Sequence, residues 1–175
     1  MIDTDDHAAY REEVKQNFGF SEWAGQTKEA DREVRSLDLQ TMTVPIAEHE
    51  DLPTSSRQRR IVRYIFGSAG KGGQLVSMIY ECNSTMDAHE TLIDVVMTYM
   101  APKLPRCGEK GLEIGDICFA GASETNVSVI FARFNILAEV RSVGQEPVSV
   151  DALARGLDEL ILSQAGRSGP GDVTA

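Results

Sequence analysis

The sequence of 175 residues is poor in side chains that bind metals, because it has only three histidines and three cysteines. None of the cysteines stands in a C-x-x-C pair, and His7, His49 and His89 are scattered along the chain. We therefore predict no metal site and no cofactor. Three cysteines are also too few for a secreted disulfide scaffold. One disulfide bond is compatible with the sequence, but nothing in the spacing requires it.

Long apolar runs are missing as well. No stretch approaches the roughly 18 residues that a membrane-spanning helix needs. The acidic start, Met1–His7, lacks the basic and apolar regions of a signal peptide. The sequence as written thus predicts a soluble, cytoplasmic protein that does not contact a membrane.

Basic residues are few and unevenly distributed. The chain has 17 basic and 27 acidic residues, a formal net charge of −10. Residues 1–51 hold 13 of the acids, whereas residues 52–73 hold five bases and no acid. Such a negative chain repels polyphosphate, so nucleic-acid binding is not expected. The basic stretch is predicted to pair with the protein's own acidic arm, or with an acidic partner.

The clearest patterns for secondary structure lie between residues 59 and 164. Residues 59–66 and 74–82 are rich in β-branched and aromatic residues, and the glycine-rich segment 67–73 separates them, which predicts a hairpin. Further strands are predicted over 112–120, 127–133 and 136–143. The last two strands form a hairpin around Phe134-Asn135, with Asn135 expected at positive φ.

Two amphipathic helices are predicted between and after these strands. Ser84 and Asp87 have the spacing of a capping box, and apolar residues then recur at helical intervals up to Tyr99. The second helix follows Ser149 and carries an apolar stripe that ends at Ile161.

The predicted class is therefore α+β, with the order ββαβββα after an N-terminal helical arm. We expect a mainly antiparallel sheet of about five to six strands, with both helices packed on one face. Residues 1–58 are predicted to be a charged arm with a short helix that docks on the body and ends in a loop over 46–58. Residues 59–164 would form the core domain, and residues 165–175 a flexible tail.

Sequence motifs for catalysis are incomplete. Only two residues separate Gly67 from Gly70, whereas a phosphate-binding loop has four between its glycines. His89-Glu90 begins like the zinc-protease motif H-E-x-x-H, but Ile93 stands where the second histidine would be. A G-x-S-x-G elbow is absent. We therefore assign no catalytic residues and favour a protein that is not an enzyme.

The open face of the sheet is the preferred candidate for a binding site. Polar residues at strand positions, among aliphatic ones, are typical either of a solvated sheet face or of a surface that binds a protein. The function predicted is protein binding or self-association through this face, with the candidate residues Arg63, Ser128, Glu139 and Arg141.

A small-molecule binder or small enzyme is the alternative. Its pocket would lie between the sheet and a helix, and its candidate residues are His89, Glu90, Asp116 and Cys118.

Overall fold

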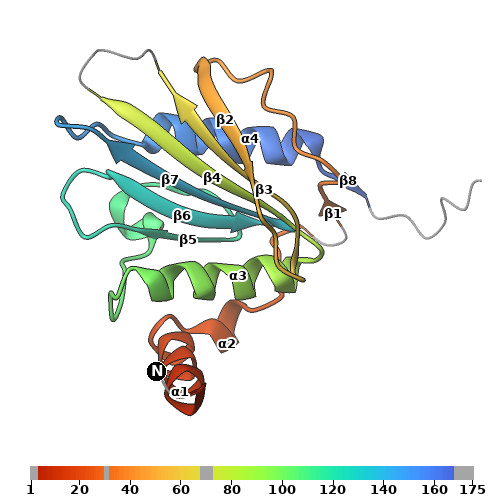
Figure 1. Cartoon of the computed structure of the whole chain (residues 1–175), viewed down its shortest axis with the longest axis vertical. Coiled ribbons are helices and arrows are strands. Elements are labelled where there is room, and N and C mark those ends of the chain that lie inside the picture. Colours follow the sequence, from red (N-terminus) through yellow and green to blue (C-terminus); the bar gives the residue numbers. More distant parts are fainter. Residues whose placement is uncertain (1–3, 30–31, 68–72, 168–175) are drawn as a thin grey trace, which may run out of the picture.

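Six strands pair into one antiparallel sheet in the order β2-β3-β4-β7-β6-β5 (Figure 1). The computed structural model describes residues 4–29, 32–67 and 73–167. The α+β class and the mainly antiparallel sheet predicted from the sequence are confirmed. The sheet strands are β2 (Ile46–Leu52), β3 (Gln58–Phe66), β4 (Gln74–Cys82), β5 (Ile117–Ala120), β6 (Ser128–Arg133) and β7 (Ile136–Val143).

Four α-helices and a small second sheet complete the described part of the chain. The second sheet pairs β1 with β8, so the first residues of the predicted tail are held against the arm. The predicted connection 67–73 and the remainder of the tail lie mostly outside the described residues. The remaining elements are α1 (Thr4–Asn17), α2 (Phe20–Trp23), β1 (Arg32–Glu33), α3 (Thr85–Thr98), a short 3₁₀ helix (Cys107–Lys110), α4 (Asp151–Gln164) and β8 (Gly166–Arg167).

Helix α3 begins where the sequence predicts. The Ser84 hydroxyl accepts a hydrogen bond from the Asp87 amide at 3.0 Å and so satisfies one free donor of the first turn. Leu92 and Val96 lie on its buried side, as the apolar stripe predicts. Helix α4 buries Leu153 and Leu157 in the same way.

Helices α3 and α4 pack on opposite faces of the sheet, which corrects the prediction that they share one face. Val129 and Phe131 of β6 belong to the core under α4. Ile130 and Ala132, which alternate with them, belong to the core under α3. Because successive side chains of a strand point to opposite faces, a strand that is apolar throughout needs a cover on each side. Figure 1 shows α3 lying between the sheet and the N-terminal helices.

Strand β2 lies in the segment 46–58 that was predicted to be a loop. Only its end residues, Ile46 and Leu52, are large aliphatics, so it carries no apolar alternation. Its acids meet the basic strand β3: Glu50 pairs with Arg63 at 2.6 Å and Asp51 with Arg60 at 2.8 Å. The predicted pairing of the basic stretch with the acidic arm is thus confirmed for these two arginines.

The N-terminal helices dock on the outer side of α3. Arg11 of α1 contacts Glu90 at 2.5 Å and Asp94 at 2.9 Å. Phe18 and Trp23 are buried against α3 and the sheet. The two N-terminal helices are therefore held on α3 by ion pairs from α1 and by the buried aromatic side chains of Phe18 and Trp23.

The turn between β6 and β7 differs from its prediction in one detail. The residue with positive φ is Phe134 (φ 53°) rather than Asn135. The amide of Asn135 bridges two segments instead, because its Nδ2 donates to the carbonyls of Val34 at 2.9 Å and Cys82 at 3.0 Å. The tip of this hairpin is thereby buried under the arm.

Candidate functional site

The four polar residues predicted for binding lie on the sheet face that α3 contacts. Arg63 of β3 is opposite Met78 of β4, which in turn is opposite Glu139 of β7. Arg141, two residues beyond Glu139, is opposite Ser128 of β6. Directly opposite residues share a face, so the strand register brings these side chains to one surface.

Access to these residues differs. The side chains of Arg63 and Arg141 are 49% and 50% exposed, whereas that of Glu139 is only 6% exposed. Glu139 accepts a hydrogen bond from the Tyr99 hydroxyl at 2.5 Å and contacts Arg141 Nε at 2.9 Å. Glu139 therefore holds the side chains of Tyr99 and Arg141 in place, but its own carboxylate is not accessible to a partner. Ser128 is partly buried.

Three aliphatic side chains lie between the two exposed arginines. Ile65 is opposite Val76, and Val76 is opposite Arg141, so these residues form the row next to Arg63 and Met78. Ile65, Val76 and Met78 are each partly exposed. We call this surface the β3–β4 face, and it comprises Arg63, Ile65, Val76, Met78 and Arg141.

The edge of the β3–β4 face toward α3 is a closed polar contact. Burial raises the pKa of Tyr99, and the charge of Glu139 and its hydrogen bond raise it further. Burial and the charge of Glu139 raise the pKa of Tyr80 to about 12. Both phenols therefore keep their protons at neutral pH, and Tyr99 remains a donor to Glu139.

The residues of the alternative pocket are largely engaged by the N-terminal arm. His89 Nδ1 accepts a hydrogen bond from the Gly25 amide at 2.9 Å, and Asp116 accepts one from the Lys28 amide at 2.8 Å. Glu90 pairs with Lys15 at 3.0 Å as well as with Arg11. The arm therefore occupies the hydrogen-bonding and charged groups that a ligand in this pocket would need.

Asp116 also belongs to a buried ionic network. Arg133, at the end of β6, donates to both carboxylate oxygens of Asp158 on α4 at 2.8 and 2.7 Å. It lies 3.5 Å from Asp116, which accepts the Phe134 amide at 2.8 Å. The network joins α4, the start of β5 and the β6–β7 turn.

Cys118 forms a disulfide bond with Cys107, which the sequence left open. The bond ties the short 3₁₀ helix to β5. Cys82 is free and buried, and burial raises the pKa of its thiol to about 12, so it is not a reactive nucleophile. Structural disulfides persist mainly in oxidising compartments. The cytoplasmic location accordingly stays a prediction that this bond does not support.

Loss of the disulfide should destabilise the protein measurably. The two cysteines are 11 residues apart, and opening a loop of this size costs about 2 to 3 kcal/mol of unfolding free energy. Urea unfolding with and without reductant measures the difference. A protein with Cys107→Ser and Cys118→Ser serves as the control, because reductant should not change its midpoint. Three titratable thiols in the denatured, unreduced wild type would contradict the bond.

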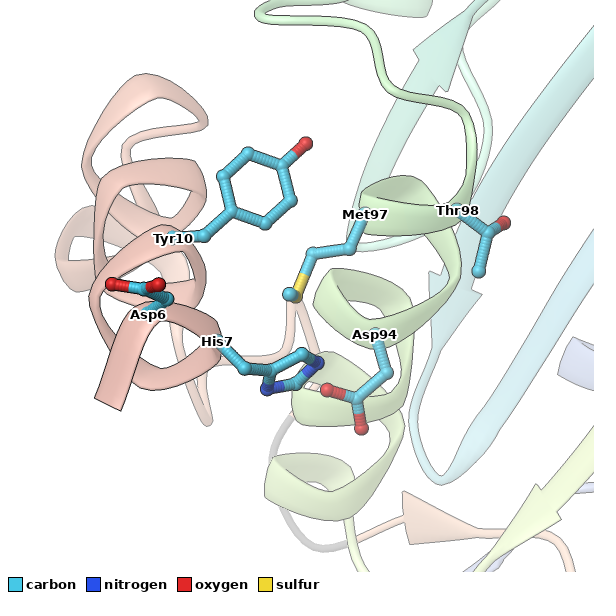
Figure 2. Close-up of a pocket in the computed structure, with 6 residues that line it drawn as sticks. All are labelled: Asp6, His7, Tyr10, Asp94, Met97 and Thr98. Atoms are coloured by element: carbon cyan, nitrogen blue, oxygen red, sulfur yellow. The ribbon is translucent and has the colours of Figure 1, made fainter. Parts of the chain in front are cut away.

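A cavity of about 490 Å³ lies between α1 and α3 (Figure 2). Figure 2 shows the Tyr10 ring of α1 facing the thioether of Met97 on α3, with His7 directed toward Asp94. The sequence did not predict it, because the position of α1 on α3 depends on contacts across the fold.

Two further cavities flank β2. One, of about 320 Å³, is lined by Tyr64, Arg60, His49 and the segment 36–40. The other, of about 200 Å³, is lined by residues of β2 together with Arg63 and Ile65. Sequence reasoning missed both, since the strand between them was predicted to be a loop. The complementary charges of residues 48–51 and 57–63 were the one available signal.

The described residues contain neither a cluster of metal ligands nor a membrane-spanning helix. Within residues 4–29, 32–67 and 73–167, no three His, Cys, Asp or Glu side chains are arranged to hold a metal ion. None of the helices in these ranges is long and apolar enough to cross a membrane.

Comparisons with protein-family models, with curated proteins and with solved structures found no match for this chain. The arrangement of its own residues is therefore the basis for assigning a function. The fold and the exposed surface define an α+β domain whose sheet is covered by helices on both faces, with the β3–β4 face left accessible.

Proposed function

We propose that this protein is a protein-binding domain and that the β3–β4 face is its binding surface. The observation that carries the proposal is the set of three partly exposed aliphatic side chains between two half-exposed arginines. Arginine and methionine are enriched in protein interfaces relative to the rest of the protein surface, whereas lysine and acidic residues are depleted there.

The arginines are held in position before any partner arrives. Glu50 orients Arg63 and Glu139 orients Arg141. Less side-chain entropy is therefore lost when these guanidinium groups meet a partner. A fitting partner presents an apolar ridge flanked by carboxylates, or it is a second copy of this chain.

The alternative, a small-molecule site between the sheet and a helix, has weaker support. His89, Glu90 and Asp116 bond to the arm, and Cys118 is in a disulfide. A ligand would have to displace several of these contacts.

Charge reversal at both arginines tests the proposal. We expect Arg63→Glu with Arg141→Glu to weaken partner binding at least about tenfold, because reversal replaces attraction with repulsion. Quantitative co-purification compares this variant with Arg35→Glu and Arg155→Glu, which changes the net charge equally at two other exposed arginines.

Light scattering separates the two kinds of partner. If the wild type is a dimer that the Arg63→Glu, Arg141→Glu variant dissociates, the partner is a second copy. Binding and oligomeric state that are the same in wild type and both variants would refute a role for the β3–β4 face.

A further inference from the structure

Strand β2 is an edge of the sheet with an accessible outer side. Among the described strands it pairs only with β3 and lies at the border of the sheet (Figure 1). Residues 47–51 are all exposed. The opposite edge is different, because Pro105 and Arg106 cover β5 through a bridge to Phe119 and a hydrogen bond from the Ala120 amide. An uncovered edge strand presents unpaired backbone groups to which another strand can add.

The two cavities beside β2 lie on opposite faces of this edge. Glu50 is opposite Arg63, so the cavity of about 200 Å³ opens on the side of the β3–β4 face. His49 is opposite Tyr64, whose ring belongs to the core under α4, so the cavity of about 320 Å³ opens on the other side. Alternate side chains of an added strand point to alternate faces and so toward these two cavities.

Tyr64 contributes a polar group to the lining of the larger cavity. The residue is only 7% exposed, yet it lines the cavity, and no described residue forms a hydrogen bond with its hydroxyl. Burial raises the pKa of this phenol, so at neutral pH it offers one donor and acceptors. A side chain of the partner that enters this cavity can therefore form a hydrogen bond with the Tyr64 hydroxyl.

The charged residues of β2 indicate which kind of strand can pair with this edge. Strand β2 carries Glu48, Glu50 and Asp51, one histidine, His49, and no lysine or arginine. Glu50 and Asp51 are paired with arginines of β3, whereas Glu48 forms no ion pair with a described residue. Antiparallel pairing with a second β2 would place acids opposite acids, which is unfavourable. A strand with lysine or arginine at alternate positions complements the edge.

We propose that β2 binds an extended basic segment of a partner protein, which adds to the sheet as a further strand and places alternate side chains in the two cavities. Main-chain hydrogen bonds supply affinity in this mode of binding, and the cavities and Glu48 supply selectivity. The proposal rests on the proposed function, because it describes how a partner reaching the β3–β4 face engages the neighbouring edge.

Peptide probes test main-chain pairing without altering the protein. The probe is an acetylated peptide of alternating lysine and valine, matched to the seven residues of β2. It is titrated to about 1 mM into ¹⁵N-labelled protein, and amide shifts report the site. Two further peptides carry N-methyl groups on the odd or on the even residues. Because only alternate amides of an added strand face β2, one methylated peptide should lose binding and the other should keep it.

The expected result is a set of shift changes centred on residues 46–52, no binding of a glutamate–valine peptide, and the stated difference between the methylated peptides. Glu48→Lys should weaken the lysine peptide about tenfold, whereas Glu159→Lys, at an exposed site on α4, should not. Absent binding, or equal binding of both methylated peptides, would overturn the proposal.

The outcome also separates this proposal from the proposed function. Arg141→Glu changes the β3–β4 face on β7, three strands from β2 in the sheet order, and should leave the peptide affinity unchanged. Shift changes confined to β4 and β7 would reject strand addition at β2 while supporting the β3–β4 face.

Discussion

Replacing Asp158 with asparagine should lower the free energy of unfolding by about 3 to 5 kcal/mol. Asp158 and Arg133 are 5% and 6% exposed, and their two hydrogen bonds are 2.8 and 2.7 Å long. Asparagine keeps the size of the side chain but leaves the arginine with a buried charge that Asp116, at 3.5 Å, only partly compensates. Desolvation opposes the charge of Arg133, and Asp158 more than offsets it, so the pKa of this guanidinium is raised.

Urea unfolding measures this loss directly. Glu159→Gln is the matched control, because it removes one negative charge from the next residue of α4, where the side chain is exposed. That change should alter the unfolding free energy by no more than about 0.5 kcal/mol. A loss below about 1 kcal/mol for Asp158→Asn would mean that the Arg133 charge is solvated by other means.

The stability of the protein should fall as the pH is lowered from about 6.5 to about 4 because of His89. Burial lowers the pKa of this imidazole from 6.5 to about 4, and the charge of Asp116 opposes the shift only in part. Nδ1 accepts the Gly25 amide, so the neutral ring carries its proton on Nε2, for which no partner is found among the described residues.

The direction of this effect follows from proton binding. Between these two pH values the unfolded chain binds a proton at His89 and the folded protein does not, so acid favours unfolding. The full shift corresponds to about 3 kcal/mol, which is present above pH 6.5 and lost as the pH falls to 4.

Unfolding free energies measured across this pH range test the assignment. His89→Gln keeps an acceptor for the Gly25 amide and should reduce the pH dependence by about one proton. His7→Gln, at an exposed position on α1, should leave the dependence as in the wild type. An equal slope in all three proteins would show that other groups cause the acid sensitivity.

Local sequence patterns predicted much of the core because their causes are local. The Ser84 cap, the stripe of α3 and the β6–β7 hairpin depend on hydrogen bonds and side-chain spacing within a few residues. Arg63, Ser128, Glu139 and Arg141 were likewise placed on one face, since strand alternation decides this once the register is known.

Access to those residues could not be predicted from the same patterns. The sequence pattern predicts Glu139 to be an exposed strand residue, but Tyr99, the C-cap residue of α3, donates a hydrogen bond to it, and its side chain is buried. Strand β2 has almost no aliphatic alternation, so only its pairing with β3 makes it a strand. Tertiary contacts therefore decided the burial of Glu139, and for β2 they also overrode a weak local propensity.

The amino-acid sequence by itself determined the α+β class, both helices and most of the strands of residues 59–164, and the alternation of their side chains, because helical and strand periods and helix caps depend on neighbouring residues. The strand predicted over 112–120 is confined to Ile117–Ala120, and the 3₁₀ helix before it was not predicted. Only the tertiary structure decided that α3 and α4 cover opposite faces, that the arm occupies His89 and Asp116, and that β2 is left as an open edge. These features depend on contacts between residues tens of positions apart, and no local pattern records which distant surface will satisfy a buried charge or an apolar strand.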